Sequence, residues 1–198
     1  MPEKIGHIRS FIAVSLPGHV KRELGRLQAR LKSAGIQASW PRTETLHLTL
    51  KFLGDIPENQ IPSIREGLSR TAARAFCFDL TAGGLGVFPG IKKPRVIWAG
   101  TGGRTDLLEK VFQDLEGELE LLGFPRENRR FSPHFTLARV KREFSPKALI
   151  RLIQACRDIR SRPFPVSSLD LFHSRLLPKG AVHTKIFSAE FSGKEISG

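Results

Sequence analysis

Two short segments of this chain repeat one pattern of apolar and polar residues around a histidine. They are Leu46-His47-Leu48-Thr49-Leu50 and Pro133-His134-Phe135-Thr136-Leu137. Residues two apart on a β-strand point to the same face of a sheet. Each segment is therefore predicted to be a strand that presents a histidine and a threonine together, and in the first segment Lys51 is expected to share their face. We expect the fold to bring the two strands together around a pseudo-two-fold axis.

Helix and strand periodicities surround the two motifs in a regular order. Alternating apolar residues predict strands at residues 6–16, 45–54, 76–82, 94–100 and 131–140, with two more between residues 164 and 192. Apolar residues at helical spacing predict four helices, within residues 18–35, 61–72, 104–122 and 146–158. This order divides into two halves of roughly strand–helix–strand type, which is a weak internal repeat.

The charge of the chain indicates its class of partner. It has 32 Lys and Arg residues against 19 Asp and Glu residues, a formal net charge of +13. Such a surplus favours polyanions, and nucleic acid more than an acidic membrane. A basic surface that serves only solubility or thermostability explains the charge equally well.

Length and apolar patterning favour one compact cytoplasmic domain that spans residues 1–198. No apolar stretch approaches the roughly 20 residues that cross a bilayer, so no membrane association is expected. The N-terminus lacks the apolar region and cleavage site of a signal peptide. Cys77 and Cys156 are expected to be buried thiols rather than a disulfide. We expect a monomer.

The paired histidines indicate acid–base chemistry. A single His-x-Thr is usually structural, but with 9 threonines in the chain two such matches among six histidines arise by chance in only about 3% of such sequences. One neutral imidazole can take a proton from water while one imidazolium protonates a leaving oxygen, and a pKa near 6.5 makes both forms accessible. A shared zinc site is the alternative, but no further ligands stand at metal-binding spacing.

Three stretches of the chain resemble the 2H phosphoesterase superfamily, namely residues 9–14 (RSFIAV), 47–54 (HLTLKFLG) and 131–139 (FSPHFTLAR). The most similar branch is the bacterial and archaeal RNA 2′,3′-cyclic phosphodiesterases, historically called 2′-5′ RNA ligases. The resemblance covers nearly the whole chain, including a hairpin from Leu176 to Gly180. It implies a bilobal α+β fold with two pseudo-symmetric lobes, each built on an antiparallel sheet with flanking helices. The active site would lie in the cleft between the lobes.

The resemblance also implies a reaction, the hydrolysis of a terminal RNA 2′,3′-cyclic phosphate to a 2′-phosphate without metal or cofactor. At the matching positions, His47 would protonate the leaving O3′ and His134 would activate water. Thr49 and Thr136 would bind phosphate oxygens, and Arg139 would neutralise charge that develops on phosphorus.

Phe52 completes the implied site as a platform for the terminal base, since stacking on an aromatic ring tolerates any base. Phe52 and Arg139 each follow their motif histidine by five residues. On a regular strand this odd offset would turn both side chains away from the histidines. We therefore predict that both motif strands twist or break before the fifth residue, as at a β-bulge. From the residues alone, Phe52 is better explained as core, whereas the planar guanidinium of Arg139 suits phosphate.

Basic residues are concentrated around the second motif, at Arg126, Arg129, Arg130, Arg139, Lys141 and Arg142. This local excess suits an RNA backbone. His183 stands where many relatives carry a tyrosine, so a contact of that ring is expected to differ here.

Two other functions fit the same residues. One is 2′-5′ RNA ligation, in which an RNA 5′-hydroxyl replaces water at the same site. The other is an RNA- or nucleotide-binding module without turnover, although binding alone does not require two groups that change protonation. Other cyclic phosphates remain open as substrates within the superfamily.

Overall fold

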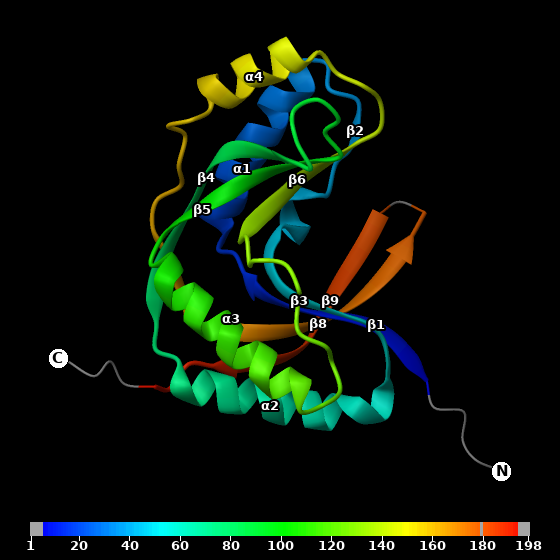
Figure 1. Ribbon diagram of the computed structural model, residues 1–198, viewed down its shortest axis with the longest axis vertical. Coiled ribbons are helices and arrows are strands. Elements are labelled where there is room, and N and C mark those ends of the chain that lie inside the picture. The colour runs from blue at the N-terminus through cyan, green and yellow to red at the C-terminus, as the bar shows by residue number, and fades with distance from the viewer. Residues whose placement is uncertain (1–5, 179, 194–198) are drawn as a thin grey trace.

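The computed structural model describes residues 6–178 and 180–193 of the chain, and two antiparallel sheets organise them (Figure 1). The first sheet has the strand order β3-β1-β8-β9. Its strands are β1 (His7–Ser15), β3 (His47–Pro57), β8 (Ser168–Leu177) and β9 (Gly180–Glu190). The expected hairpin joins β8 to β9, and Lys179 within it lies outside the described residues.

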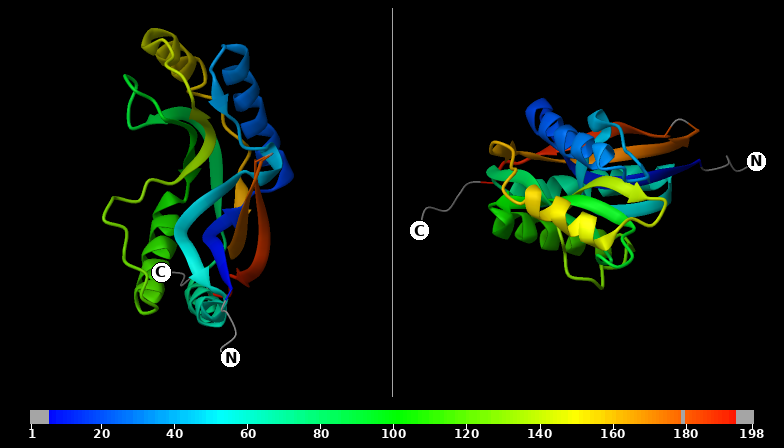
Figure 2. Two further views of the ribbon diagram at one scale, coloured as in Figure 1. Left: turned by 90° about the vertical axis from the view of Figure 1, so that its right-hand side faces the viewer. Right: turned by 90° about the horizontal axis from the view of Figure 1, so that it is seen from above.

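The second sheet has the order β2-β6-β5-β4-β7. Its strands are β2 (Ala38–Ser39), β4 (Phe78–Phe88), β5 (Val96–Gly103), β6 (His134–Val140) and β7 (Phe164–Val166). The two views of Figure 2 show the sheets as separate layers. The motif strands β3 and β6 contact each other, so each sheet contributes one histidine motif to a shared region.

Four helices cover the sheets, as predicted. They are α1 (Gly18–Ser33), α2 (Ile61–Arg74), α3 (Thr105–Glu120) and α4 (Pro146–Ala155), with two short 3₁₀ turns, η1 (Thr43–Thr45) and η2 (Glu58–Gln60). Helix α1 contacts β4 and β6, whereas α2 packs on β8 and β9 beside α3 (Figure 1). The predicted apolar stripe of α1, for example Val20 and Leu24, is buried, and Gly35 follows that helix with a φ of +82°.

The two sheets do not correspond to the two halves of the sequence. The first sheet combines β1 and β3 from the start of the chain with β8 and β9 from its end. Alternation shows that a segment is a strand but does not select its partner, which is decided by the surfaces that can bury each other. The tail also forms three strands rather than two, and the short edge strand β2 was not predicted.

One continuous apolar core joins both layers. It includes residues from each motif strand, Leu48 of β3 and Phe135 of β6, both fully buried. Cys156 is buried as expected, but Cys77 is exposed because it lies between α2 and β4, where the chain turns at the surface. Among the described helices none is both long and apolar enough to cross a membrane.

Candidate active site

Both motif histidines are held by the same local hydrogen bond. The Nδ1–H of His47 donates to the carbonyl of Thr45 at 2.8 Å, and the Nδ1–H of His134 donates to the carbonyl of Ser132 at 2.7 Å. In each case the acceptor lies two residues before the ring. The bond assigns the proton of the neutral ring to Nδ1 and leaves Nε2 to accept or donate a proton in chemistry.

His47 lies in a tight aromatic environment. Its ring stacks on Phe11 with centroids 4.6 Å apart, lies 6.2 Å from Phe172, and meets the edge of His183 at 5.3 Å. Burial lowers the pKa of His47 from 6.5 to about 4, and the positive charges of His183 and Lys21 act in the same direction. The Thr45 carbonyl opposes this shift of the pKa because it stabilises the imidazolium.

His183, whose ring contact was expected to differ in this chain, lies against His47. Burial also lowers its pKa, and its Nδ1 has no hydrogen-bond partner among the described residues. A tyrosine is neutral near pH 7 and would not place a positive charge beside His47. Here the two rings are coupled, since a proton on one disfavours a proton on the other.

His134 has its own aromatic support on the second sheet. Its ring packs edge-to-face with Phe88, with centroids 5.1 Å apart, and its centroid lies 6.1 Å from that of Trp98. The indole of Trp98 in turn covers Gly86, where a Cβ atom would stand only 2.1 Å from the ring. A glycine is therefore required at residue 86 for Trp98 to reach this position.

A cavity of about 630 Å³ is lined by residues of both sheets. Of the six residues expected in the site, its walls include His47, Thr49, Phe52, Thr136 and Arg139. His134 is not among the lining residues, although it precedes Thr136 by two positions on β6. The lining contains no aspartate or glutamate among the described residues, so the cavity suits an anion.

The predicted irregularity is present in both motif strands. The ladder between β1 and β3 skips Leu50, and the ladder between β5 and β6 skips Leu137. Each bulge thus falls three residues after the motif histidine and reverses the alternation that follows. As a result Phe52 and Arg139 both line the cavity. The predicted break in each motif strand is confirmed.

The same bulge shows that the expected face of Lys51 was wrong. Lys51 turns away from the cavity and is buried, with its Nζ 2.7 Å from Glu116 of α3 and 2.7 Å from the carbonyl of Pro125. Phe52 takes the place on the cavity side and is 62% exposed, so the interpretation of Phe52 as a core residue was also wrong.

Three arginines line the cavity, Arg9, Arg42 and Arg139, and within the described chain none of them forms an ion pair. Of the basic cluster expected around the second motif only Arg139 lines the cavity, while Arg126 pairs with Glu120. Sequence reasoning did not assign roles to Arg9 and Arg42. The run Trp40-Pro41-Arg42, which precedes the first motif by a few residues and joins an aromatic ring to a cation, was the available signal.

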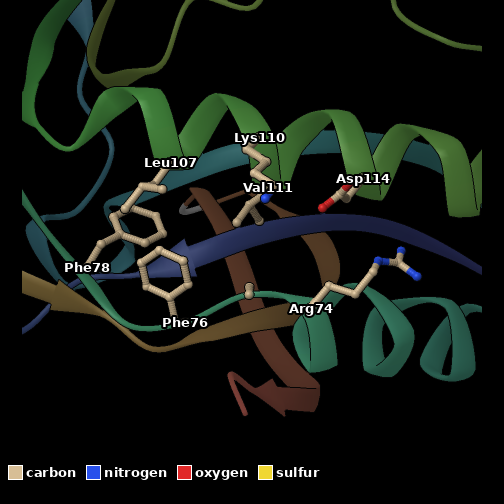
Figure 3. Close-up of a pocket in the computed structure, with 8 residues that line it drawn as sticks. Arg74, Phe76, Phe78, Leu107, Lys110, Val111 and Asp114 are labelled. Carbon is tan, nitrogen blue, oxygen red and sulfur yellow. The ribbon is translucent and has the colours of Figure 1, made fainter. Parts of the chain in front are cut away.

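A second, much smaller hollow lies away from this cavity, between the end of α2 and one side of α3 (Figure 3). It encloses about 10 Å³, room for about one water molecule. Phe76, Phe78 and Val111 line it, with charged groups around them, and it shares no residue with the larger cavity.

The family model described as LigT like Phosphoesterase matches residues 14–98 and 102–183. An RNA 2′,3′-cyclic phosphodiesterase of Thermotoga maritima is 34% identical over 188 residues, which cover 94% of this chain and 97% of that relative. One of Methanothermobacter thermautotrophicus is 34% identical over 182 residues, 89% of this chain and 95% of that relative.

Solved structures share the fold. The crystal structure of TT0787 from Thermus thermophilus superposes with a TM-score of 0.79 at 28% identity and covers 95% of this chain and 100% of that one. The structure of Escherichia coli LigT complexed with 3′-AMP has a TM-score of 0.75 at 21% identity, with 94% and 99% coverage. These matches confirm the expected α+β fold with two antiparallel sheets and four helices.

Proposed function

This chain belongs to the family of LigT-like phosphoesterases, and on that premise we propose that it hydrolyses the 2′,3′-cyclic phosphate at an RNA end to a 2′-phosphate by metal-independent acid–base catalysis. The observation that carries the proposal is the matched pair of imidazoles. Each has its Nδ1 bonded to the carbonyl two residues before it, and their two strands meet beside a cavity that no carboxylate of the described residues lines.

The residues divide the work by position. A proton from His47 goes to the leaving O3′, and His134 takes a proton from the water that attacks phosphorus. The hydroxyls of Thr49 and Thr136 bind phosphate oxygens, and the guanidinium of Arg139 neutralises the charge that develops on them. Both histidines then exchange protons with solvent and return to their starting states. One water is consumed for each P–O3′ bond broken.

The terminal base stacks on Phe52. This ring is 62% exposed although it is apolar, and it stands on the cavity side of β3 because of the bulge at Leu50. An exposed aromatic platform recognises the end of an RNA rather than a particular sequence.

The low pKa of His47 places a condition on its role as acid. With a pKa of about 4, this ring is neutral in the free protein at neutral pH. A bound phosphate raises the pKa, because a nearby negative charge favours the imidazolium. The acid therefore forms when the substrate is in place, beside the leaving oxygen.

The test is an EDTA-treated assay on a short RNA that ends in a 2′,3′-cyclic phosphate, with the product assigned by phosphorus NMR. Replacing His47 or His134 by alanine is expected to lower turnover by about 10² to 10⁴ without unfolding the protein. His7→Ala is the matched control, since this exposed histidine lies on β1 outside the cavity. A 3′-phosphate product would reverse the assignment of the leaving oxygen. Turnover that requires added divalent metal would refute the mechanism.

A further inference from the structure

We propose that the cavity contains a second nucleotide subsite, formed by Trp40, Arg42 and Arg9, which binds the nucleotide preceding the cyclic phosphate. The inference rests on the proposed function and narrows its substrate class. The preferred substrate is then an RNA strand of at least two nucleotides rather than a free nucleoside 2′,3′-cyclic phosphate.

Charge is the first argument. A cyclic phosphate carries one negative charge, which Arg139 is positioned to meet at the end of the second motif. Arg9 and Arg42 are additional exposed guanidiniums on the same cavity, and no ion pair neutralises either of them in the described chain. The nearest acid along the strand ladder is Asp55, opposite Arg9, and it neither pairs with Arg9 nor lines the cavity. A further phosphodiester supplies the missing negative charge.

The aromatic rings give the second argument. Phe52 of the first sheet is the platform proposed for the terminal base, and Trp40 lines the same cavity directly after β2 of the second sheet. Trp40 follows Ser39, which lies opposite Arg139 in the pairing of β2 with β6. The ammonium of Lys32 lies 5.3 Å from the indole centroid and helps to hold the ring. Trp40 and Arg42 thus bring a second ring and a second cation to the same cavity, the combination that binds successive nucleotides of a single strand.

The hairpin between β8 and β9 adds an apolar wall. Leu176 is 67% exposed and, with Gly180 and Ala181, lines the cavity. These residues come from the end of the chain, whereas Trp40 and Arg42 come from its first quarter. The cavity therefore extends beyond the two motifs, and its additional walls offer contacts to a base and a phosphate.

The test compares three substrates in the full-length protein. They are a nucleoside 2′,3′-cyclic phosphate, the same molecule with a 5′-phosphate, and a dinucleotide with a 2′,3′-cyclic end. We expect the wild type to have the highest kcat/KM on the dinucleotide. Trp40→Ala should reduce the ratio of dinucleotide to nucleoside kcat/KM by about five- to a hundredfold, the range for loss of one stacked base.

Matched variants separate the contributions to this ratio. Trp40→Phe keeps a ring and should retain most of the ratio, which separates stacking from a folding defect of Trp40→Ala. Arg42→Gln should reduce the gain from the 5′-phosphate and from the dinucleotide alike. Arg30→Gln removes the same charge from the exposed face of α1, outside the cavity, and should keep the wild-type ratio.

Three results would overturn the inference. They are equal wild-type kcat/KM on all substrates, a 5′-phosphate that produces the whole gain of the dinucleotide, or a Trp40→Ala loss that is the same on all three. Absence of turnover on every substrate would refute the proposed function instead. In that case the subsite is tested by calorimetric titration with a dinucleotide 2′-phosphate and with a nucleoside 2′-phosphate. The dinucleotide should bind more tightly, and equal affinities would overturn the inference.

Discussion

Binding of a phosphate beside His47 is expected to return the pKa of its imidazole toward neutral pH. In the free protein the pKa is lowered from 6.5 to about 4, mainly by burial against Phe11, Phe172 and His183. This shift disfavours the imidazolium by about 3 kcal/mol. A single negative charge at about 4 Å, with an effective dielectric constant of about 20, favours it by about 4 kcal/mol. The two effects nearly cancel, so we expect the bound phosphate to raise the pKa by roughly two to three units.

Histidine NMR provides the direct measurement. The ring resonances of His47, assigned through a His47→Gln variant, are followed against pH in the free protein and with saturating nucleoside 2′-phosphate. The free midpoint should lie near pH 4 and the bound midpoint at least two units higher. In kinetics, a general acid that must be protonated produces the alkaline limb of the pH profile. This limb of kcat/KM reports the free enzyme and that of kcat reports the complex, so the limb should lie at higher pH in kcat.

Two results would refute this reasoning. A free midpoint near 6.5 would show that burial does not hold the ring neutral. An unchanged midpoint on binding would show that the phosphate does not lie against His47, and the acid role would then have to pass to another group. No carboxylate lines the cavity within the described chain, so the group on its walls that competes as the source of such a limb is the coupled ring of His183.

Three further outcomes follow from the same contacts. Because the folded-state pKa of His47 lies below 6.5, its contribution to stability is complete above pH 6.5 and falls by up to about 3 kcal/mol as the pH drops to 4. Urea unfolding at pH 7 and 4.5 should therefore show a larger loss of stability in the wild type than in His47→Gln. Lys51→Met leaves Glu116 buried without its cation and should lower the free energy of unfolding, measured with urea, by about 3–5 kcal/mol. Adding Glu116→Gln, which keeps an acceptor for the amide of Glu127, should recover part of that loss. An unchanged unfolding midpoint in Lys51→Met would count against the ion pair. Arg139→Lys keeps the charge but loses the planar fork, so kcat/KM should fall by about ten- to a hundredfold, and wild-type activity would exclude bidentate phosphate binding.

Much of the site could be predicted because its information is local. The His-x-Thr spacing sets which side chains share a strand face, and the five-residue offset of Phe52 and Arg139 requires a break in alternation. The bulges at Leu50 and Leu137 supply that break. The helices were predictable for a similar reason, since an apolar stripe such as that of α1 reports which face a helix must bury.

The sequence by itself determined the four helices, the paired motif strands and their bulges, because periodicity and spacing act within a few residues. Only the tertiary structure decided that β1, β3, β8 and β9 share one sheet and that Lys51 is buried against α3. It also decided the low pKa of His47, because rings from residues 11, 172 and 183 jointly exclude water from it. Burial and electrostatics are sums over segments far apart in the chain, and local patterns do not specify which segments meet.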